Sequence, residues 1–379
     1  MTPMTSKERL LRTINRQPAD CVPATPDTSN MIPARLTGKP FWDIYLYQDP
    51  PLWKAYIECV KHFGFDGFVN APVVFPQEAP VENPWKLAIV QQTEERIVTQ
   101  RYRLANGAMV WEDCVTVYPV SDPPTRNIRP ISKVRLPDVP EEWTPVEGVK
   151  PWPTGQELLE LILDEMGGHG IVGLHCGGTV VVNGPDQILD YYDNPERYQE
   201  KSRRMLEAAE RRFEIIRNLP RKPDFISCGG SGTLVWQSPR MARELALPIA
   251  QRVTKLAKRA GIPTHVHSCG PERALVEMCA LETDLSCIDP LEARPMGDCD
   301  LAEIKKSFGQ RLALKGNLHT TAVMLHGKPG DVVEASKKAI DAAAEGGGFI
   351  LSTGDQCGRD TPDENLLALI ETARTYGRY

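Results

Sequence analysis

His267 and Cys269 lie two residues apart and are the pair in this sequence best suited to bind a metal ion. They follow the apolar stretch Pro263–Val266, which predicts a buried strand. In an extended segment, residues two apart project to the same side, so both side chains can face one point. Imidazole and thiolate are ligands that zinc favours. A buried histidine beside a buried cysteine, with no metal, is the alternative that this pair alone leaves open.

A catalytic zinc ion needs a third protein ligand, and the sequence offers Asp355 and Cys357. Both follow the apolar stretch Gly348–Thr353, again with a spacing of two residues. A thiolate is the softer ligand and suits zinc better, so Cys357 is the favoured third ligand. Asp355 is then expected to act as a neighbouring carboxylate or as a proton donor.

Other polar residues and glycines follow the remaining predicted strands. In a parallel α/β barrel, the active site is built at the carboxyl ends of the strands and in the loops after them. The residues in such positions include His175, Gly230, Ser231, His265, Glu292, Asn317 and His319. With His267, four of the seven histidines in the chain lie there, which is the strongest indication of a functional site from the residues alone.

The glycine-rich turn Gly229–Gly232 has three interpretations. Its successive N–H groups could bind an anion, its lack of side chains could admit a large flat ligand, or it is only a loop. Nucleoside triphosphate binding is not expected, because the pattern G-x-x-x-x-G-K-S/T is absent. A serine hydrolase is not expected either, because the chain has no G-x-S-x-G.

Short apolar strands alternate with helices along the last two thirds of the chain, and these elements must position the site. The predicted strands are Cys21–Ala24, Gly67–Val73, Gly170–Cys176, Asp224–Cys228, Pro263–Val266, Leu285–Asp289, Arg311–Lys315 and Gly348–Thr353. The predicted helices include Lys7–Arg16, with a Thr5/Glu8 capping box, Pro195–Leu219 and Pro239–Ala260. Eight such strands predict a closed (β/α)₈ TIM barrel. A doubly wound open sheet is the alternative, but its G-x-G-x-x-G turn is missing.

Residues 75–153 interrupt this alternation. Arg96–Leu104 and Met109–Val117 predict a β-hairpin with a type I′ turn at Asn106-Gly107. The proline-rich segment Pro119–Pro153 is too poor in periodic apolar residues for a second hydrophobic core. The chain is therefore expected to be a single barrel domain, residues 1–379, with a hairpin and a proline-rich segment inserted at about 75–153, in a place where a lid could form.

Composition argues against several classes of protein. The net charge is −6 and no helix face is lined with basic residues, so nucleic acid is not an expected partner. The apolar stretches are far too short to cross a bilayer, and the N-terminus lacks the apolar region of a secretory signal. The ten cysteines show no disulfide spacing. These features predict a soluble cytoplasmic protein with reduced thiols.

Several motifs resemble those of the uroporphyrinogen decarboxylase superfamily. They occur in the family's order at Thr5–Leu11, Ser238-Pro239, His267–Gly270, Pro290–Glu292, Gly297–Leu301, Lys315–Asn317 and Asp360–Asn365. The resemblance covers nearly the whole chain and implies a (β/α)₈ barrel. The decarboxylases carry an arginine-rich segment after the first strand, whereas Pro23–Met31 contains no arginine. At the H-x-C motif the chain resembles the branch of corrinoid-dependent methyltransferases.

The resemblance to that branch implies a zinc-dependent enzyme that moves a methyl group between a small methylated substrate and the cobalamin of a separate corrinoid protein. A methyl ether is the favoured substrate, with aromatic methyl ethers as candidates, which would make the enzyme an O-demethylase. The alternatives are a decarboxylase of a porphyrinogen-like or small carboxylic acid, and a non-catalytic module that binds a tetrapyrrole. The sequence leaves open whether the protein forms a homodimer.

The resemblance also implies roles for the residues of the barrel mouth. His267 and Cys269 are expected to bind zinc together with a later cysteine, whose usual position falls nearer Asp355, with Cys357 two residues beyond. The residues expected to protonate or orient the leaving group are Asp355, Glu292, His265 and His319. Those expected to bind the substrate or the corrinoid are His175, Gly230, Ser231 and Asn317.

Overall fold

The computed structural model describes residues 3–75 and 85–379 of the chain, which divides into two compact units. Unit 1 comprises residues 1–27, 60–72 and 159–379, and unit 2 comprises residues 28–59 and 73–158. The predicted insertion at about 75–153 includes residues 76–84, which lie outside the described residues. In the part of the chain that is described, no helix is long and apolar enough to cross a bilayer.

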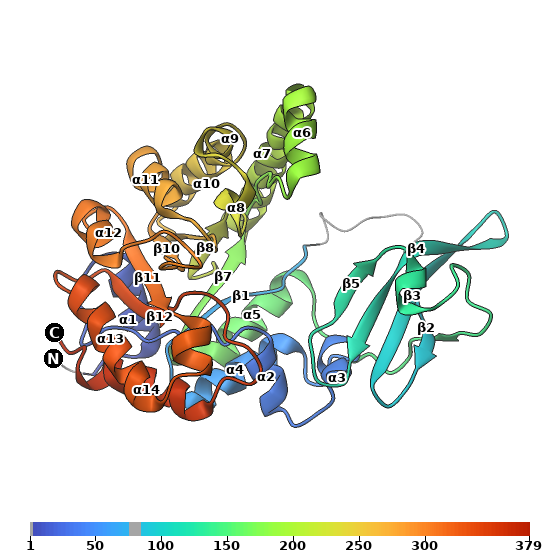
Figure 1. Ribbon diagram of the computed structural model, residues 1–379, viewed down its shortest axis with the longest axis horizontal. Helices are drawn as coiled ribbons and strands as arrows, with labels where there is room; N and C mark the ends of the chain where they lie inside the picture. Colours follow the sequence, from blue (N-terminus) through green and yellow to red (C-terminus); the bar gives the residue numbers. More distant parts are fainter. Residues whose placement is uncertain (1–2, 76–84) are drawn as a thin grey trace. The chain divides into compact units, whose positions relative to one another are not determined.

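Unit 1 is built on a curled parallel sheet, which has seven strands among the described residues, in the order β1-β7-β8-β9-β10-β11-β12 (Figure 1). The strands are β1 (Gly67–Asn70), β7 (Gly170–His175), β8 (Phe225–Cys228), β9 (Thr264–His267), β10 (Cys287–Asp289), β11 (Ala313–Leu318) and β12 (Phe349–Thr353). Nearly all residues of β7 to β12 are buried, as in a parallel sheet that is covered on both faces. Seven of the eight predicted strands are therefore confirmed.

The eighth predicted strand, Cys21–Ala24, does not form as a strand. It makes an isolated parallel bridge between Ala24 and Leu351 of β12. Pro23 has no N–H to donate to a neighbouring strand, which limits regular pairing there. On the other side, the Asp66 N–H beside β1 donates to the carbonyl oxygen of Ala24. The strands form an open curled sheet, and a fully closed barrel is not confirmed.

Helices connect successive strands of unit 1 and pack on the outside of the sheet. They are α1 (Ser6–Ile14), α6 (Pro185–Asp193), α7 (Pro195–Asn218), α8 (Thr233–Trp236), α9 (Pro239–Leu245), α10 (Leu247–Arg259), α11 (Arg273–Glu282), α12 (Leu301–Phe308), α13 (Pro329–Ala343) and α14 (Asp363–Thr375), with short helices η3 (Gly167–His169) and η4 (Thr320–Leu325). Helices α7, α10, α11, α12 and α13 contact one another in that order, as Figure 1 also shows. The predicted capping box of Thr5 and Glu8 is confirmed at the start of α1.

The helix predicted from Pro239 to Ala260 is wrong as a single element, because the structure divides it into α9 and α10. Pro248 lies in the first turn of α10 and has no N–H to continue the hydrogen bonds of α9. The predicted N-cap at Ser238 is confirmed, since its side chain accepts a hydrogen bond from a backbone N–H of the first turn.

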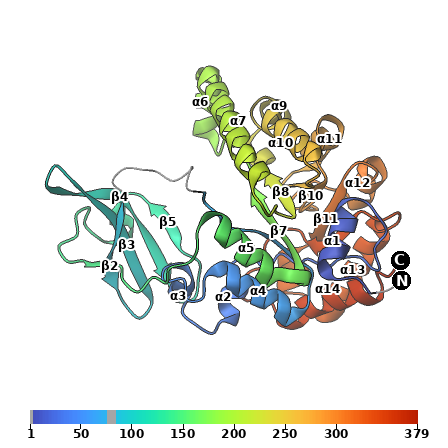
Figure 2. The same ribbon diagram turned by 180° about the vertical axis from the view of Figure 1, so that it is seen from behind.

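Unit 2 contains an antiparallel sheet, with five strands among the described residues, in the order β5-β4-β3-β2-β6 (Figure 2). The strands are β2 (Lys86–Gln92), β3 (Arg96–Ala105), β4 (Ala108–Pro119), β5 (Thr125–Ile128) and β6 (Thr144–Pro145), and the helices are α2 (Met31–Leu36), α3 (Phe41–Tyr45) and η2 (Ile131–Val134). Helices α4 (Leu52–Phe63) and α5 (Gly155–Met166) each span a boundary between the units. Asn106 and Gly107 join β3 to β4 with φ of 52° and 78°, so the predicted hairpin is confirmed.

The expectation that the region after the hairpin lacks a hydrophobic core is wrong. Val98 on β3 and Val115 and Val117 on β4 are buried against Ile131, which comes from the proline-rich segment. The alternation of side chains along the hairpin supplies most of this core, so the connecting segment needs to add few apolar residues.

Candidate functional site

The candidate site begins with His267, the last residue of β9, and Asp289, the last residue of β10. The two strands pair in parallel with Asp289 opposite His267, so the two side chains meet at the carboxyl edge of the sheet. His267 Nδ1 lies 2.9 Å from Asp289 Oδ1. A carboxylate in this position orients the imidazole and leaves Nε2 free for another partner, as in many metal-binding histidines.

Asp289 is buried at the centre of a polar cluster. Lys315 forms an ion pair with its other carboxylate oxygen, and His265 Nε2 lies 3.0 Å from Oδ1 without the alignment of a hydrogen bond. Burial acts to raise the pKa of Asp289, but Lys315 and the two histidines outweigh it and hold that pKa well below its usual range. Asp289 is therefore a charged group that fixes the orientation of His267.

Cys269 lies in the loop after β9 and is half-buried. Its thiol accepts a hydrogen bond from His267, and its Sγ lies 3.1 Å from Ser231 Oγ. The hydrogen bond from His267 lowers the pKa of Cys269, burial opposes this, and Ser231 lowers it further. Burial acts to lower the pKa of His267, but the charge of Asp289 raises it to about 11. The environment thus favours the thiolate, which is the form that binds metals and acts as a nucleophile.

Asp355 lies beside the pair. Its Oδ1 is 4.0 Å from His267 Nε2. Cys357 is fully buried, and its N–H donates to the carbonyl oxygen of Asp27 at 2.8 Å. Burial raises the pKa of the Cys357 thiol to about 12, so this side chain is held as a neutral thiol.

His267 Nε2, Cys269 Sγ and the Asp355 carboxylate offer nitrogen, sulfur and oxygen donors, a set that suits zinc with a fourth position open. Within residues 3–75 and 85–379, no three His, Cys, Asp or Glu side chains lie close enough to hold a metal as they stand. The residues thus fit zinc in chemistry, and two of the three donor side chains are in contact. The half-buried Asp355 side chain would have to move towards the pair to complete the set.

A hollow of about 20 Å³ lies next to this group and is lined by Glu292, Asn317, His319 and Gly354, among others. Glu292 is buried, accepts a hydrogen bond from the Gly270 N–H, and has a pKa that burial raises. Asn317 Nδ2 donates to a backbone carbonyl at 2.9 Å, which fixes its amide group. A carboxyl group and an amide therefore border one small space near the His267–Cys269 pair.

His319 also borders this hollow and has a fixed tautomer. Its Nδ1 accepts hydrogen bonds from the backbone N–H groups of Thr321 and Ala322, at 3.2 and 3.1 Å. Because Nδ1 accepts, the proton of the neutral ring must be on Nε2. His319 is thus prepared to donate a hydrogen bond from Nε2.

The remaining predicted site residues are His265, His175 and Gly230. His265 is buried between the rings of Phe68 and Phe225, and its Nε2 lies beside the Asp289 carboxylate. His175 is exposed, and its Nδ1 lies 3.2 Å from a serine hydroxyl of β8. A side chain at Gly230 would come within 2.8 Å of Val181, so packing of the chain against itself already requires glycine there.

Asp289 and Lys315 are the functional residues to which the sequence assigned no role. Lys315 lies within an apolar strand, and a buried ammonium needs a charged partner. The parallel pairing of β10 with β11 brings the two residues to the same edge of the sheet. The lysine could have been identified from the sequence, but its partner depends on the strand register.

Glu272 is a further buried carboxyl group behind the site. Its Oε2 accepts a hydrogen bond from the Leu291 N–H at 3.0 Å, and its Oε1 has no partner among the described residues. Burial raises its pKa well above 4.5; the bond from Leu291 and the charge of His267 oppose this shift, while Asp289 and Glu292 add to it. The folded protein therefore keeps Glu272 protonated at pH values where the unfolded chain releases the proton.

This difference predicts how the Glu272→Gln variant responds to pH. A raised pKa in the folded state means that the wild type loses stability as the pH rises above about 4.5, and the amide has no proton to release. We expect the stability of the variant, relative to the wild type, to increase as the pH rises above about 4.5, by up to about 1.4 kcal/mol per pH unit. Urea denaturation at several pH values measures this difference, and a pH-independent difference would contradict the prediction.

The comparisons with known proteins agree with the motifs. Residues 233–376 match the family model of uroporphyrinogen decarboxylase (URO-D). The chain is 29% identical over 133 residues to the methylcobamide:CoM methyltransferase MtbA of Methanosarcina mazei, which covers 35% of either chain. It is 27% identical over 140 residues to the uroporphyrinogen decarboxylase of an Azoarcus species, which covers 36% of this chain and 37% of the relative. The chain thus spans little more than a third of the length of these curated relatives.

A solved structure of a methyltransferase from Methanosarcina mazei has a similar fold, with a TM-score of 0.57 over 98% of this chain and 99% of the other. At 16% sequence identity, this similarity concerns the fold alone. The region that matches the family model contains His267, Cys269, Asp289 and Asp355. The family model matches residues 233–376, and six of the seven motifs that resemble the uroporphyrinogen decarboxylase superfamily lie in this part of the chain.

Proposed function

We propose that this protein is a methyltransferase that moves a methyl group between a small methylated substrate and the cobalamin of a separate corrinoid protein. The observation that carries the proposal is the pair at the carboxyl edge of the sheet, in which Asp289 orients His267 and His267 contacts Cys269. The similarity to a methylcobamide:CoM methyltransferase supports the same class of reaction.

We further propose that zinc binds to His267, Cys269 and Asp355. When bound, zinc would supply a Lewis acid that polarises the heteroatom carrying the methyl group, or would stabilise a thiolate. A methyl ether is the favoured substrate, because an ether oxygen leaves readily only when it is protonated or bound to a metal. In this proposal Glu292, whose pKa burial raises, donates that proton, and His319 Nε2 orients the substrate.

A methyl-transfer assay tests this proposal. The protein is incubated with cob(I)alamin and, separately, with methyl ethers, methylamines and methyl thioethers, and formation of methylcobalamin is followed by its absorbance. We expect activity with one class, accompanied by about one zinc ion per chain, and a loss of at least about 100-fold in His267→Ala and Cys269→Ala. His169→Ala, which removes an exposed histidine at η3, serves as the control. Full activity in metal-free protein would contradict the role of zinc.

Decarboxylation is the second candidate, because part of the chain is similar to a uroporphyrinogen decarboxylase. It predicts release of CO₂ without zinc or cobalamin. The carboxyl groups of Glu292 and Asp355 lie close enough to interact and border the site, which disfavours a substrate with many carboxylates. CO₂ release from a small carboxylic acid by the metal-free protein would identify the protein as a decarboxylase.

We also propose that residues 1–379 form a single barrel domain with one insertion, and that the extended segment Pro23–Thr25 takes the eighth place in a closed (β/α)₈ barrel. In support, the Leu351 N–H of β12 donates to Pro23 O, and the Thr25 N–H donates back to Leu351 O, both at 2.9 Å. Asp66 beside β1 contacts the same segment from the other side through Ala24.

A further inference from the structure

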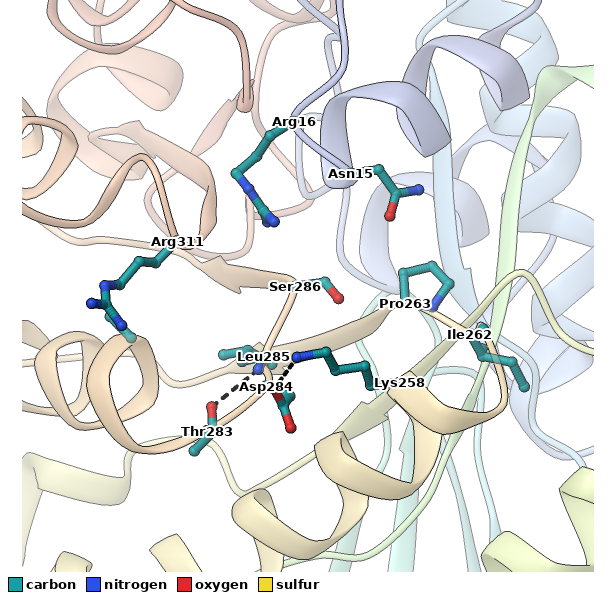
Figure 3. A pocket seen from close by; sticks show the side chains of 12 residues that line it. Asn15, Arg16, Lys258, Ile262, Pro263, Thr283, Asp284, Leu285, Ser286 and Arg311 are labelled. Carbon is teal, nitrogen blue, oxygen red and sulfur yellow. Dashed lines mark hydrogen bonds and ion pairs between the residues drawn. The ribbon is translucent and has the colours of Figure 1, made fainter.

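A second hollow, of about 400 Å³, lies in unit 1 at the opposite ends of the strands that carry the candidate site (Figure 3). Its lining includes Pro263, Ser286 and Arg311, which precede β9, β10 and β11. His267 and Asp289 stand at the other ends of β9 and β10. The hollow is therefore separate from the candidate site, although both lie at ends of the same strands.

Three cations and one carboxylate line this hollow. Lys258 Nζ forms an ion pair with Asp284 Oδ1 at 2.5 Å. Arg16 and Arg311 form no ion pair with any of the described residues. Figure 3 shows their side chains entering from different elements, Arg16 from the end of α1 and Arg311 from just before β11. Two positive charges without a countercharge thus face one space.

Arg16 adopts a backbone conformation that is unusual for an arginine. Its φ of 56° lies in the left-handed region, which glycine and asparagine adopt more readily. Its side-chain stem lies against Gly348, where a Cβ would come within 3.1 Å of Arg16 Cγ. The missing side chain at Gly348 therefore leaves room for the stem of Arg16.

The helices that end at this hollow oppose an anion but do not outweigh the arginines. Asn15 is the C-cap residue of α1, Lys258 lies in the last turn of α10, and Thr283 follows the last residue of α11. Each helix C-terminus carries an effective charge of roughly −0.5. Three helix ends together therefore offset roughly 1.5 of the two uncompensated guanidinium charges, and a smaller net positive charge remains.

We propose that this hollow binds a small dianion, either a phosphate group or a dicarboxylate, between Arg16 and Arg311. The planar guanidinium group binds both kinds of anion through paired hydrogen bonds. The Ser286 hydroxyl accepts from the Thr264 N–H, which leaves its own hydrogen to donate to the ligand. The volume of about 400 Å³ is in the range of sites for small metabolites.

Calorimetric titration of the full chain at fixed ionic strength tests the proposal, with inorganic phosphate in one arm and succinate in the other. Saturable binding of one of them at a single site is expected, and the preferred anion distinguishes the phosphate class from the dicarboxylate class. Arg16→Gly and Arg311→Gln are each expected to weaken binding at least about tenfold. Arg211→Gln on α7 removes an exposed charge elsewhere in unit 1 and should bind as the wild type does.

Weaker binding by Arg16→Gly would not be explained by misfolding, because glycine suits the backbone conformation at this position. We expect this variant to unfold at or above the temperature of the wild type without ligand, and yet to lose the response to the anion. The proposal is overturned if neither anion binds saturably, or if both arginine variants bind as tightly as the wild type.

Discussion

Replacing Asp289 by asparagine is expected to lower the free energy of unfolding by about 3–5 kcal/mol, because the substitution leaves a buried ammonium group without its countercharge. Lys315 is 6% exposed and forms its ion pair with Asp289, so water cannot replace the lost partner. Two histidines, His265 and His267, lose the same carboxylate. Urea denaturation at pH 7 measures the change.

The double variant Asp289→Asn/Lys315→Met separates the charge from the shape of the cluster. Methionine resembles the lysine stem and needs no countercharge, so we expect the double variant to regain most of the lost stability. Lys315→Met alone keeps the carboxylate, which can still interact with the two histidines. A double variant as unstable as Asp289→Asn would show that the ion pair is not the cause.

The double variant should still bind zinc poorly, even with its stability restored. Asparagine can hold His267 Nδ1 through its carbonyl oxygen, but it lacks the charge that strengthens the bond and makes the imidazole a better ligand. The expected loss of zinc affinity is about 10–100-fold. Restored stability with reduced affinity identifies Asp289 as a positioning residue, whereas restored affinity would reduce its role to that of a countercharge.

The sequence predicted the strands of the parallel sheet well, because a buried parallel strand is apolar on both faces and ends at glycine, proline or aspartate. It could not predict that Cys21–Ala24 makes only isolated bridges, to Arg378 and to Leu351, since the number of ladder hydrogen bonds depends on the neighbouring strands. The division of α9 from α10 was readable at Pro248, which the periodicity of apolar residues obscured.

The sequence also singled out the His267–Cys269 pair and offered Asp355 and Cys357 as the group beside it, but it favoured Cys357. The alternation rule applies only while the chain is extended. After β12 the chain turns, because the Thr353 hydroxyl donates to the carbonyl oxygen of Asp355 at 2.7 Å. Asp355 and Cys357 therefore do not share one side, although their spacing is the same as that of His267 and Cys269.

This turn leads to an expected difference between two single variants in their affinity for zinc. Asp355→Ala is expected to lower the affinity at least about 100-fold, because it removes the carboxylate that lies 4.0 Å from His267 Nε2. Cys357→Ala should leave the affinity within about threefold and cost only about 1 kcal/mol of stability, since it removes one small buried group.

Competition with a chromophoric chelator measures both affinities, and cobalt(II) substitution adds an independent measurement. The charge-transfer absorbance of a cobalt–thiolate bond scales with the number of thiolates bound. A site in which Cys269 is the single thiolate ligand should therefore show the absorbance of one cobalt–thiolate bond. Cys357→Ala should then leave this absorbance unchanged, while Cys269→Ala abolishes it.

If Cys357→Ala halves the absorbance and releases the metal while Asp355→Ala retains the metal, then Cys357 is the third ligand. The burial that raises its pKa would then have to be relieved when the metal binds, through movement of the segment that holds Cys357 against Asp27.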